Sequence, residues 1–212
     1  RTWRVLVQAD QPFRMRPDDI NRFAAAGVVA SIQPTHATSD KNMAGDRLGE
    51  ARLEGAYAWH TLLVSGADLA GGSDFPVESV NPFFGLHASV TRQGQDNRPP
   101  GGWLPGEKLD RAQTLSLFTE GAAFAAHQEQ RIGRLLPGYS ADFILVRDDY
   151  FKVTEDQLWN NRVLATYVAG RQVFREVVSE PEDALERADG SRVWLRWTVH
   201  PWRDSEGMVQ GL

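Results

Sequence analysis

Short, nearly continuous apolar runs alternate with longer amphipathic stretches along the first part of the sequence. The runs cover residues 3–9, 28–33 and 69–74. A strand of a parallel sheet is buried on both faces, so it reads as such a run rather than as alternating apolar and polar residues. Strands that alternate with amphipathic helices indicate a parallel sheet covered by helices. The sequence therefore predicts an α/β fold with three strand-helix units.

Helices are predicted from their start signals and from the spacing of apolar residues. One helix begins at Arg16-Pro17, with proline in its first turn, and ends at Gly27. A later one begins at Asp110, which forms a capping box with Gln113. The helix that begins at Asp110 is predicted to end at residue 127. Two further helices are predicted, over residues 45–64 and from residue 82 onward, and loops are predicted over residues 35–40 and 94–106.

The character of the sequence changes near Glu129, where β-type patterns replace the helical ones. Residues 133–146 form a turn-rich β segment, and residues 163–174 are typical of a hairpin that turns at Gly170-Arg171. Residues 179–189 are then predicted to form an acidic linker or helix, which precedes an alternating strand over residues 192–200. We therefore predict domains over residues 1–128, 129–178 and 179–212.

Composition narrows the possible partners and chemistry. A net charge of -5 and a pI near 5.6 argue against a nucleic-acid surface or an anionic membrane surface, since either needs a basic face. The sequence contains no apolar run of about 18 residues, so no membrane span is predicted. We expect a cytoplasmic protein. Because the chain has no cysteine, any metal would be held by His, Asp, Glu or a modified Lys.

Asp74 stands at the end of the third predicted strand. The run Leu69-Ala70-Gly71-Gly72-Ser73-Asp74 delivers one carboxylate and then meets Pro76. Parallel strands present catalytic groups at their C-terminal ends, so Asp74 is a candidate catalytic residue. Gly-Ser-Asp is also frequent in turns, and a loop or cap aspartate is the alternative interpretation.

Several motifs then occur in an order that resembles one enzyme family. They are residues 32–40 around Gln33-Pro34-Thr35-His36, residues 55–59, residues 72–78 around Gly72-Ser73-Asp74, residues 81–82, 90–93 and 121–123, and residues 133–146. Over roughly residues 15–175 the series is similar to the amidohydrolase 3 family. That family includes N-substituted formamide deformylase-like enzymes within the metal-dependent amidohydrolase superfamily.

The resemblance implies a fold, a reaction and two site residues. The fold is a partial (β/α)8 TIM barrel, of which the last three strand-helix units are present, followed by part of a small β-sandwich and a C-terminal β-hairpin. The reaction is hydrolysis of a non-peptide C–N bond in a small amide, formamide or carbamate. Asp74 is implied to bind a divalent metal, zinc above all, and to shuttle a proton. His36 is implied to contact the substrate, with a loop histidine bonded to neighbouring backbone as the alternative.

One departure from the family weakens this expectation. The family carries an Arg-Ile-Glu-His-Ala-type motif on strand six, but residues 4–9 read Arg-Val-Leu-Val-Gln-Ala and contain no histidine. The family's other metal ligands would all lie before Arg1, so the chain alone is expected to be inactive. A non-catalytic remnant or interaction module is therefore the competing hypothesis. His87, Arg92 and Gln93 remain weaker candidates, for which packing or helix-end hydrogen bonds are the alternative.

The C-terminal tail resembles part of a different protein class. Residues 189–207 look like the closing strands of a PAS sensor domain, without the ligand-binding part of that fold. The apolar strand in this tail could pair with another chain, so a homo-oligomer is one expectation. Packing of an Arg/Trp-rich hairpin on the sandwich is the other.

Overall fold

The computed structural model describes residues 4–8, 15–176, 183–186 and 192–195. The chain forms two compact units, Arg1–Val173 and Phe174–Leu212. This division rests on contacts within the chain and does not test the domain boundaries predicted at residues 128 and 178, which stay predictions.

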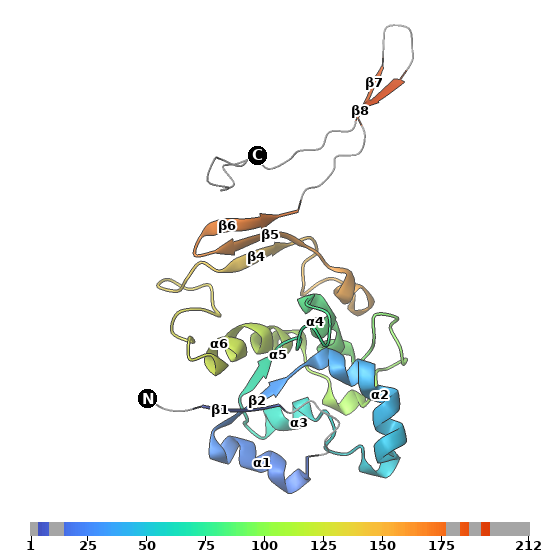
Figure 1. The fold of residues 1–212 in the computed structure, drawn as a ribbon, viewed down its shortest axis with the longest axis vertical. Coiled ribbons are helices and arrows are strands. Elements are labelled where there is room, and N and C mark those ends of the chain that lie inside the picture. The colour runs from blue at the N-terminus through green and yellow to red at the C-terminus, as the bar shows by residue number, and fades with distance from the viewer. Residues whose placement is uncertain (1–3, 9–14, 177–182, 187–191, 196–212) are drawn as a thin grey trace. The chain divides into compact units, whose positions relative to one another are not determined.

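A parallel sheet lies at the centre of the first unit (Figure 1). Its strands run in the order β1 (Val5–Gln8), β2 (Val28–Ile32) and β3 (Leu69–Gly71). In register, Val7 of β1 faces Ala30 of β2, which in turn faces Leu69 of β3. The three apolar runs are therefore strands of one parallel sheet, as predicted, and the α/β class is confirmed.

Helices follow each strand of this sheet and lie around it in Figure 1. They are α1 (Pro17–Ala26), α2 (Pro34–Leu48), α3 (Trp59–Val64), α4 (Pro82–Thr91), α5 (Arg111–Ser116) and α6 (Ala122–Ala125), with short 3-10 turns at Glu50–Arg52, Pro105–Glu107 and Glu155–Asn160. The start of α1 at a proline and its end at Gly27, whose φ is 63°, are as predicted. Asn81 caps α4 by accepting a hydrogen bond from the amide of Phe83 at 3.0 Å.

Two predictions about the segment after β2 are wrong. Residues 35–40 form the first turns of α2 rather than a loop, because Pro34 occupies the first helical position behind the extended Gln33. Residues 45–64 do not form one long helix. The backbone turns left-handed at Gly49 (φ 71°), Gly55 (φ 81°) and Tyr57 (φ 50°), and an α-helix cannot continue through such residues.

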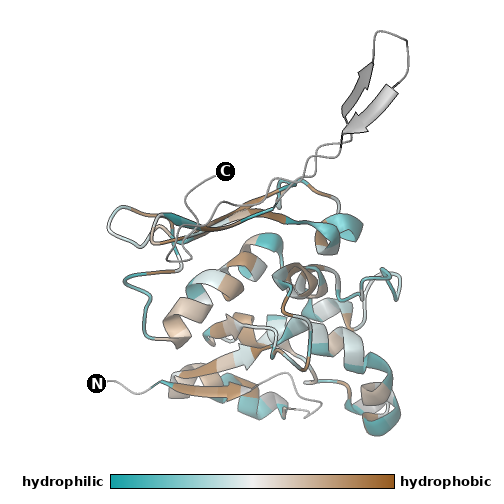
Figure 2. Ribbon diagram, turned by 45° about the horizontal axis from the view of Figure 1, so that its top comes forward, coloured by the Kyte–Doolittle hydropathy of each residue, from teal (hydrophilic) through white to brown (hydrophobic). Residues whose placement is uncertain are grey.

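The hydrophobic core is built from both the strands and the helices. Figure 2 shows the strands as largely hydrophobic, whereas the helices carry hydrophobic and hydrophilic residues together. Tyr57, Trp59 and Leu62 are fully buried against Ile32 of β2. The break between α2 and α3 thus places two large aromatic side chains, Tyr57 and Trp59, in the core.

The helical segment after the long loop packs unusually closely on β3. Its capping box is present as predicted, with Asp110 Oδ1 accepting from the Gln113 amide at 2.7 Å. Between α5 and α6 the helix widens into a π-type segment, Leu117–Gly121. A Cβ placed on Gly121 would lie 2.1 Å from the carbonyl oxygen of Leu69. This contact requires glycine at position 121.

The remaining strands form two further sheets. One has the order β4 (Phe143–Val146), β5 (Val163–Val168) and β6 (Arg171–Arg175). The predicted hairpin is present, but its turn lies at Ala169 and Gly170, one residue earlier than predicted, since Arg171 already belongs to β6. In the second unit, β7 (Asp183–Glu186) and β8 (Arg192–Leu195) pair antiparallel. The prediction of a linker or helix is therefore wrong for residues 183–186, because they pair with β8 as a strand.

The predicted strand over residues 192–200 is confirmed as far as Leu195, and the rest of it lies outside the described residues. The likeness of this tail to a PAS domain stays a prediction. Among the helices that the structure describes, none is long and apolar enough to cross a membrane.

Candidate functional site

The two residues singled out in the sequence lie together at the carboxyl ends of neighbouring strands. His36 is in the first turn of α2, directly after β2, and Asp74 follows β3 by three residues. The Nε2 atom of His36 is 3.8 Å from Oδ2 of Asp74. In parallel α/β sheets this edge is where ligands bind and where catalytic side chains collect.

The backbone around Asp74 directs its carboxylate to this edge. Asp74 has a φ of 56°, in the left-handed region, which aspartate tolerates better than most residues. Its carbonyl accepts a hydrogen bond from the amide of Val77 at 2.8 Å, and the amide of Gly72 donates to Ile32 O at 3.1 Å. The chain therefore turns sharply after β3 while remaining tied to β2. Non-glycine residues held in this conformation occur often at functional sites.

The two side chains differ in exposure. The His36 side chain is 8% exposed, whereas that of Asp74 is 41% exposed. The helix that carries His36 begins at Pro34, and the amide of His36 donates to the carbonyl of Gln33 at 3.0 Å. The imidazole is consequently held by a rigid, buried helix start, and the carboxylate stays open to a ligand.

An imidazole nitrogen and a carboxylate oxygen are ligands that suit a divalent metal such as zinc. Within the part of the chain that the structure describes, no group of three or more His, Cys, Asp or Glu side chains could hold such an ion. Asp74 thus fits a metal site as one exposed carboxylate donor, with the His36 imidazole beside it. Zinc sites in enzymes generally use three protein ligands, so further ligands would have to come from elsewhere.

Comparison with known proteins places this arrangement in a family. The profile of the amidohydrolase family (Amidohydro_3) matches residues 6–174, so the chain belongs to the amidohydrolase family. It is 32% identical over 157 residues to "Putative amidohydrolase YtcJ" of Bacillus subtilis, covering 74% of this chain and 30% of that protein. It is 34% identical over 164 residues to LONG AFTER FAR-RED 3 of Arabidopsis thaliana, covering 76% and 27% respectively.

A solved structure agrees with this assignment. An uncharacterized metal-dependent hydrolase from Pyrococcus horikoshii OT3 superposes with a TM-score of 0.62 at 28% identity, over 72% of this chain and 30% of that one. The chain thus spans less than a third of the length of each of these three proteins.

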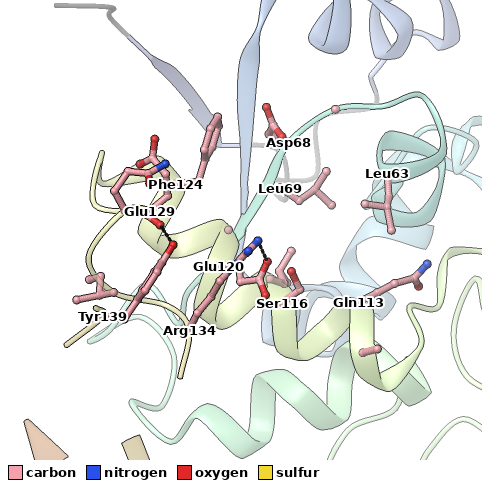
Figure 3. Close-up of a pocket in the computed structure, with 16 residues that line it drawn as sticks. Leu63, Asp68, Leu69, Gln113, Ser116, Glu120, Phe124, Glu129, Arg134 and Tyr139 are labelled. Atoms are coloured by element: carbon pink, nitrogen blue, oxygen red, sulfur yellow. Dashed lines mark hydrogen bonds and ion pairs between the residues drawn. The ribbon is translucent and has the colours of Figure 1, made fainter. Parts of the chain in front are cut away.

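Another pocket, of about 640 Å³, is at the opposite end of β3 (Figure 3). Asp68 and Leu69, which begin that strand, line it. Two of its charged side chains, Arg134 and Glu120, form an ion pair, and Glu129 pairs with Arg4, which does not line the pocket. The Arg134 guanidinium lies 2.7 Å from Glu120 Oε2, and Tyr139 Oη donates to the Glu129 carbonyl at 2.9 Å. Because Arg134, Glu120 and Glu129 already have partners within the chain, we assign no catalysis to this pocket.

His87 is a buried histidine that does not reach the Asp74 edge. Its Nδ1 is 3.0 Å from the carbonyl of Glu155 and its Nε2 is 3.1 Å from the carbonyl of Gly94. Burial lowers the pKa of His87 below its ordinary value of 6.5, although both carbonyls and the charges of Glu155 and Asp156 oppose the shift. His87 therefore joins α4 to the loop that follows it and to the 3-10 turn Glu155–Asn160, and the packing interpretation is favoured over a catalytic one.

We expect His87 to make folding sensitive to mild acid. Because the unfolded chain binds a proton at this residue more readily than the folded chain, its contribution is present above pH 6.5 and is lost as the pH falls below that value. One such proton changes the free energy of unfolding by at most about 1.4 kcal/mol per pH unit. Urea unfolding between pH 7.5 and 5 should show a shallower decline for His87→Gln than for the parent. Parallel declines would contradict this assignment.

Arg92 is a buried cation at the end of α4. Its guanidinium lies 4.1 Å from the ring centre of Trp59, and it donates through Nε to Trp103 O at 2.9 Å and through Nη1 to Tyr57 O at 3.2 Å. Burial lowers the pKa of Arg92 to about 10, with the charge of Glu107 opposing the shift, so the side chain remains charged at neutral pH. Arg92 thus ties the loop after α4 to the core, and its side chain donates to distant backbone carbonyls rather than to the end of its own helix.

Replacing Arg92 with lysine should destabilise the fold by about 2 to 3 kcal/mol. The lysine ammonium would still be a buried charge. The planar guanidinium, its stacking on Trp59 and its hydrogen bonds to the carbonyls of Trp103 and Tyr57 would be lost. Both side chains require the same left-handed backbone, so strain at position 92 cancels in the comparison. Thermal and urea unfolding measure the change, with exposed Arg47→Lys as the control. A loss below 0.5 kcal/mol, typical of surface exchanges, would contradict the role of Arg92.

Two further residues at this edge were used in the sequence only as parts of motifs. Thr35 precedes His36, and Glu78 follows Asp74 by four residues. Both line a second pocket between α2 and α4. Their positions in the sequence close to His36 and Asp74 were the available signal that they belong to the site. Threonine and glutamate are too common at protein surfaces for the residue type alone to indicate a role.

Proposed function

We propose that this chain supplies the C-terminal part of a metal-dependent amidohydrolase that hydrolyses a non-peptide C–N bond. Its substrate class is a small N-substituted amide, formamide or carbamate. The observation that carries the proposal is the approach of His36 Nε2 to Asp74 Oδ2, at 3.8 Å, at the carboxyl edge of a parallel sheet. Family membership makes this edge the expected place for hydrolysis.

The proposal includes an architecture. The units that contain β1, β2 and β3 would be the last three of a (β/α)8 barrel, and β4 to β6 would be part of a small β-sandwich. Support comes from the parallel order and from the exposed apolar edge strand. Val5, Leu6 and Val7 are 55%, 48% and 40% exposed, although a central barrel strand is buried on both faces. Further strands supplied from outside this chain would cover them.

Asp74 and His36 would divide the work at the site. A divalent ion, zinc above all, would polarise the carbonyl group of the substrate and lower the pKa of a bound water. The Asp74 carboxylate would contribute one ligand, accept a proton from the attacking water and return it to the departing nitrogen. The water hydroxyl thus ends on the carbonyl carbon and the proton on the amine. His36, held in the first turn of α2, would orient the carbonyl group of the substrate.

A non-catalytic interaction module is the second candidate, because residues 4–9 contain no histidine where the resemblance implies one. In that case the sheet β4 to β6 and the PAS-like tail would serve association. Deleting residues 179–212 and measuring the oligomeric state by light scattering distinguishes association from packing. An unchanged oligomeric state would reject the association role of the tail.

The experiment that tests the hydrolase supplies the missing part of the barrel. The chain is mixed or co-expressed with the N-terminal part of YtcJ, loaded with zinc, and offered a panel of amides, formamides and carbamates. Amine release that requires both polypeptides supports the proposal. A complex that binds zinc but leaves the whole panel unhydrolysed favours the interaction module.

A further inference from the structure

We propose that the pocket beside the His36–Asp74 pair is a specificity subsite for an alkylammonium group. The pocket has a volume of about 300 Å³ and lies between the start of α2, the loop that precedes α4 and the loop that follows it. Thr35 and Glu78 belong to its lining and are close in sequence to His36 and Asp74. The inference rests on the proposed function only where it assigns the bound group to a hydrolase substrate.

The charge of the lining favours a cation. Glu78 and Asp96 bring two carboxylates to the pocket. Among the residues that the structure describes, no Lys or Arg lines it. His87, which also lines it, does not offset these charges at neutral pH, since burial lowers the pKa of the imidazole. An anionic ligand would therefore meet repulsion here, and a cation would meet attraction.

Two polar side chains of the lining, Thr38 and Gln93, offer acceptors while their donors are in use elsewhere. The Thr38 hydroxyl donates to the carbonyl of Thr35 at 2.9 Å. The Gln93 side-chain amide donates to the carbonyls of Asn97 and Pro99 at 2.9 Å and 2.8 Å. Oxygen lone pairs remain available on both side chains. An ammonium group carries three donors and no acceptor, which complements such a lining.

Thr35 provides an observation independent of the carboxylates. The residue is 8% exposed, and within the described structure its buried hydroxyl has no hydrogen-bond partner. A buried hydroxyl without a partner is unfavourable, so a group that binds in this pocket and donates to it is stabilised. A ligand ammonium can donate, whereas a ligand carbonyl could only accept.

Phe84 favours a ligand whose ammonium group is attached to an alkyl chain. This half-buried aromatic ring is the large apolar member of the lining. It suits a short alkyl stem, and an aromatic face also attracts a cation. The pocket thus suits a substrate that carries an ammonium group on a short alkyl stem.

The test measures binding by the full chain, without any requirement for turnover. The ¹⁵N-labelled chain is titrated with n-butylammonium, n-butanol and butyrate, and amide shifts of Gly94, Gln95 and Glu78 are followed. Butylammonium should give saturable shifts at these residues, with binding at least about tenfold tighter than that of butanol or butyrate, because hydrogen bonds to charged groups are the stronger ones.

Substitutions separate the pocket from other carboxylates. Glu78→Gln should weaken butylammonium binding about tenfold, as should Thr35→Val, whereas Thr35→Ser keeps the hydroxyl and should retain affinity within threefold. Asp46→Asn, which removes an exposed carboxylate of α2, is the matched control and should change nothing. Equal or tighter binding of butyrate or butanol, or no saturable shift with butylammonium, overturns the subsite.

The same measurement keeps the subsite distinct from the proposed function. Butylammonium binding without any hydrolysis by the zinc-loaded complex would retain the subsite and reject the hydrolase. Hydrolysis without butylammonium binding would retain the hydrolase and reject the subsite.

Discussion

Asp74→Asn is expected to lower amide hydrolysis by the zinc-loaded complex by about 10²- to 10⁴-fold, the range that a positioned acid–base group contributes. Asparagine has the same shape and also tolerates the left-handed backbone of position 74, where φ is 56°. It has no basic oxygen to accept a proton from water, and it cannot pass a proton to the leaving nitrogen. The loss should therefore appear in kcat while the fold is unchanged.

Asp68→Asn is the matched control for this experiment. Asp68 lies directly before β3, at the opposite end of the strand from Asp74, and its side chain is exposed. Its amide variant should keep full activity. Steady-state amine release at saturating substrate measures both variants. Equal kcat values for the Asp74 variant and the parent would remove Asp74 from the chemistry.

Gly121→Ala is expected to be among the most destabilising single substitutions in the chain, at about 3 kcal/mol. Its new methyl would lie 2.1 Å from the backbone oxygen of Leu69, which cannot move without displacing β3. Since β3 pairs with β2 and leads directly to Asp74, a displaced strand would also disturb the candidate site.

Gly45→Ala is a control of opposite sign. Gly45 lies inside α2, and a Cβ there would meet nothing within 4 Å, so alanine should stabilise the helix by about 0.5 to 1 kcal/mol. Chemical unfolding of both variants tests the two predictions together. Similar effects at the two positions would show that the close contact of the π-type segment with β3 does not exist in solution.

The strands and the position of Asp74 could be predicted from the sequence because they depend on local patterns. A continuous apolar run indicates a buried parallel strand, and its end predicts where a functional carboxylate lies. The caps at Gly27 and Asp110 were recognisable for the same reason, since each depends on a few neighbouring residues.

The errors arose where distant contacts decide the conformation. The apolar spacing over residues 45–64 suits one helix, but burial of Tyr57 and Trp59 against the sheet requires the left-handed turns that break it. The polar composition of residues 35–40 suggested a loop, although Pro34 is an equally good helix start. Composition alone does not separate these alternatives.

The second pocket could not be predicted, because segments far apart in the sequence form it. Thr35, Glu78, Phe84 and Gln93 come from four different segments and become neighbours only when α2 packs on α4. The approach of His36 to Asp74 has the same origin, since it depends on the pairing of β2 with β3. Motif order suggested that the two residues act together, and the sheet brings them together.

Metal-dependent amine release by the reconstituted complex tests the central claim most directly. The chain and the N-terminal part of YtcJ are assayed on the amide panel before treatment with a chelator, after it, and after zinc is returned. The account predicts that hydrolysis disappears with the metal, returns with zinc, and is absent from either polypeptide alone. Hydrolysis that survives metal removal, or its absence from a complex that carries bound zinc, would contradict the account.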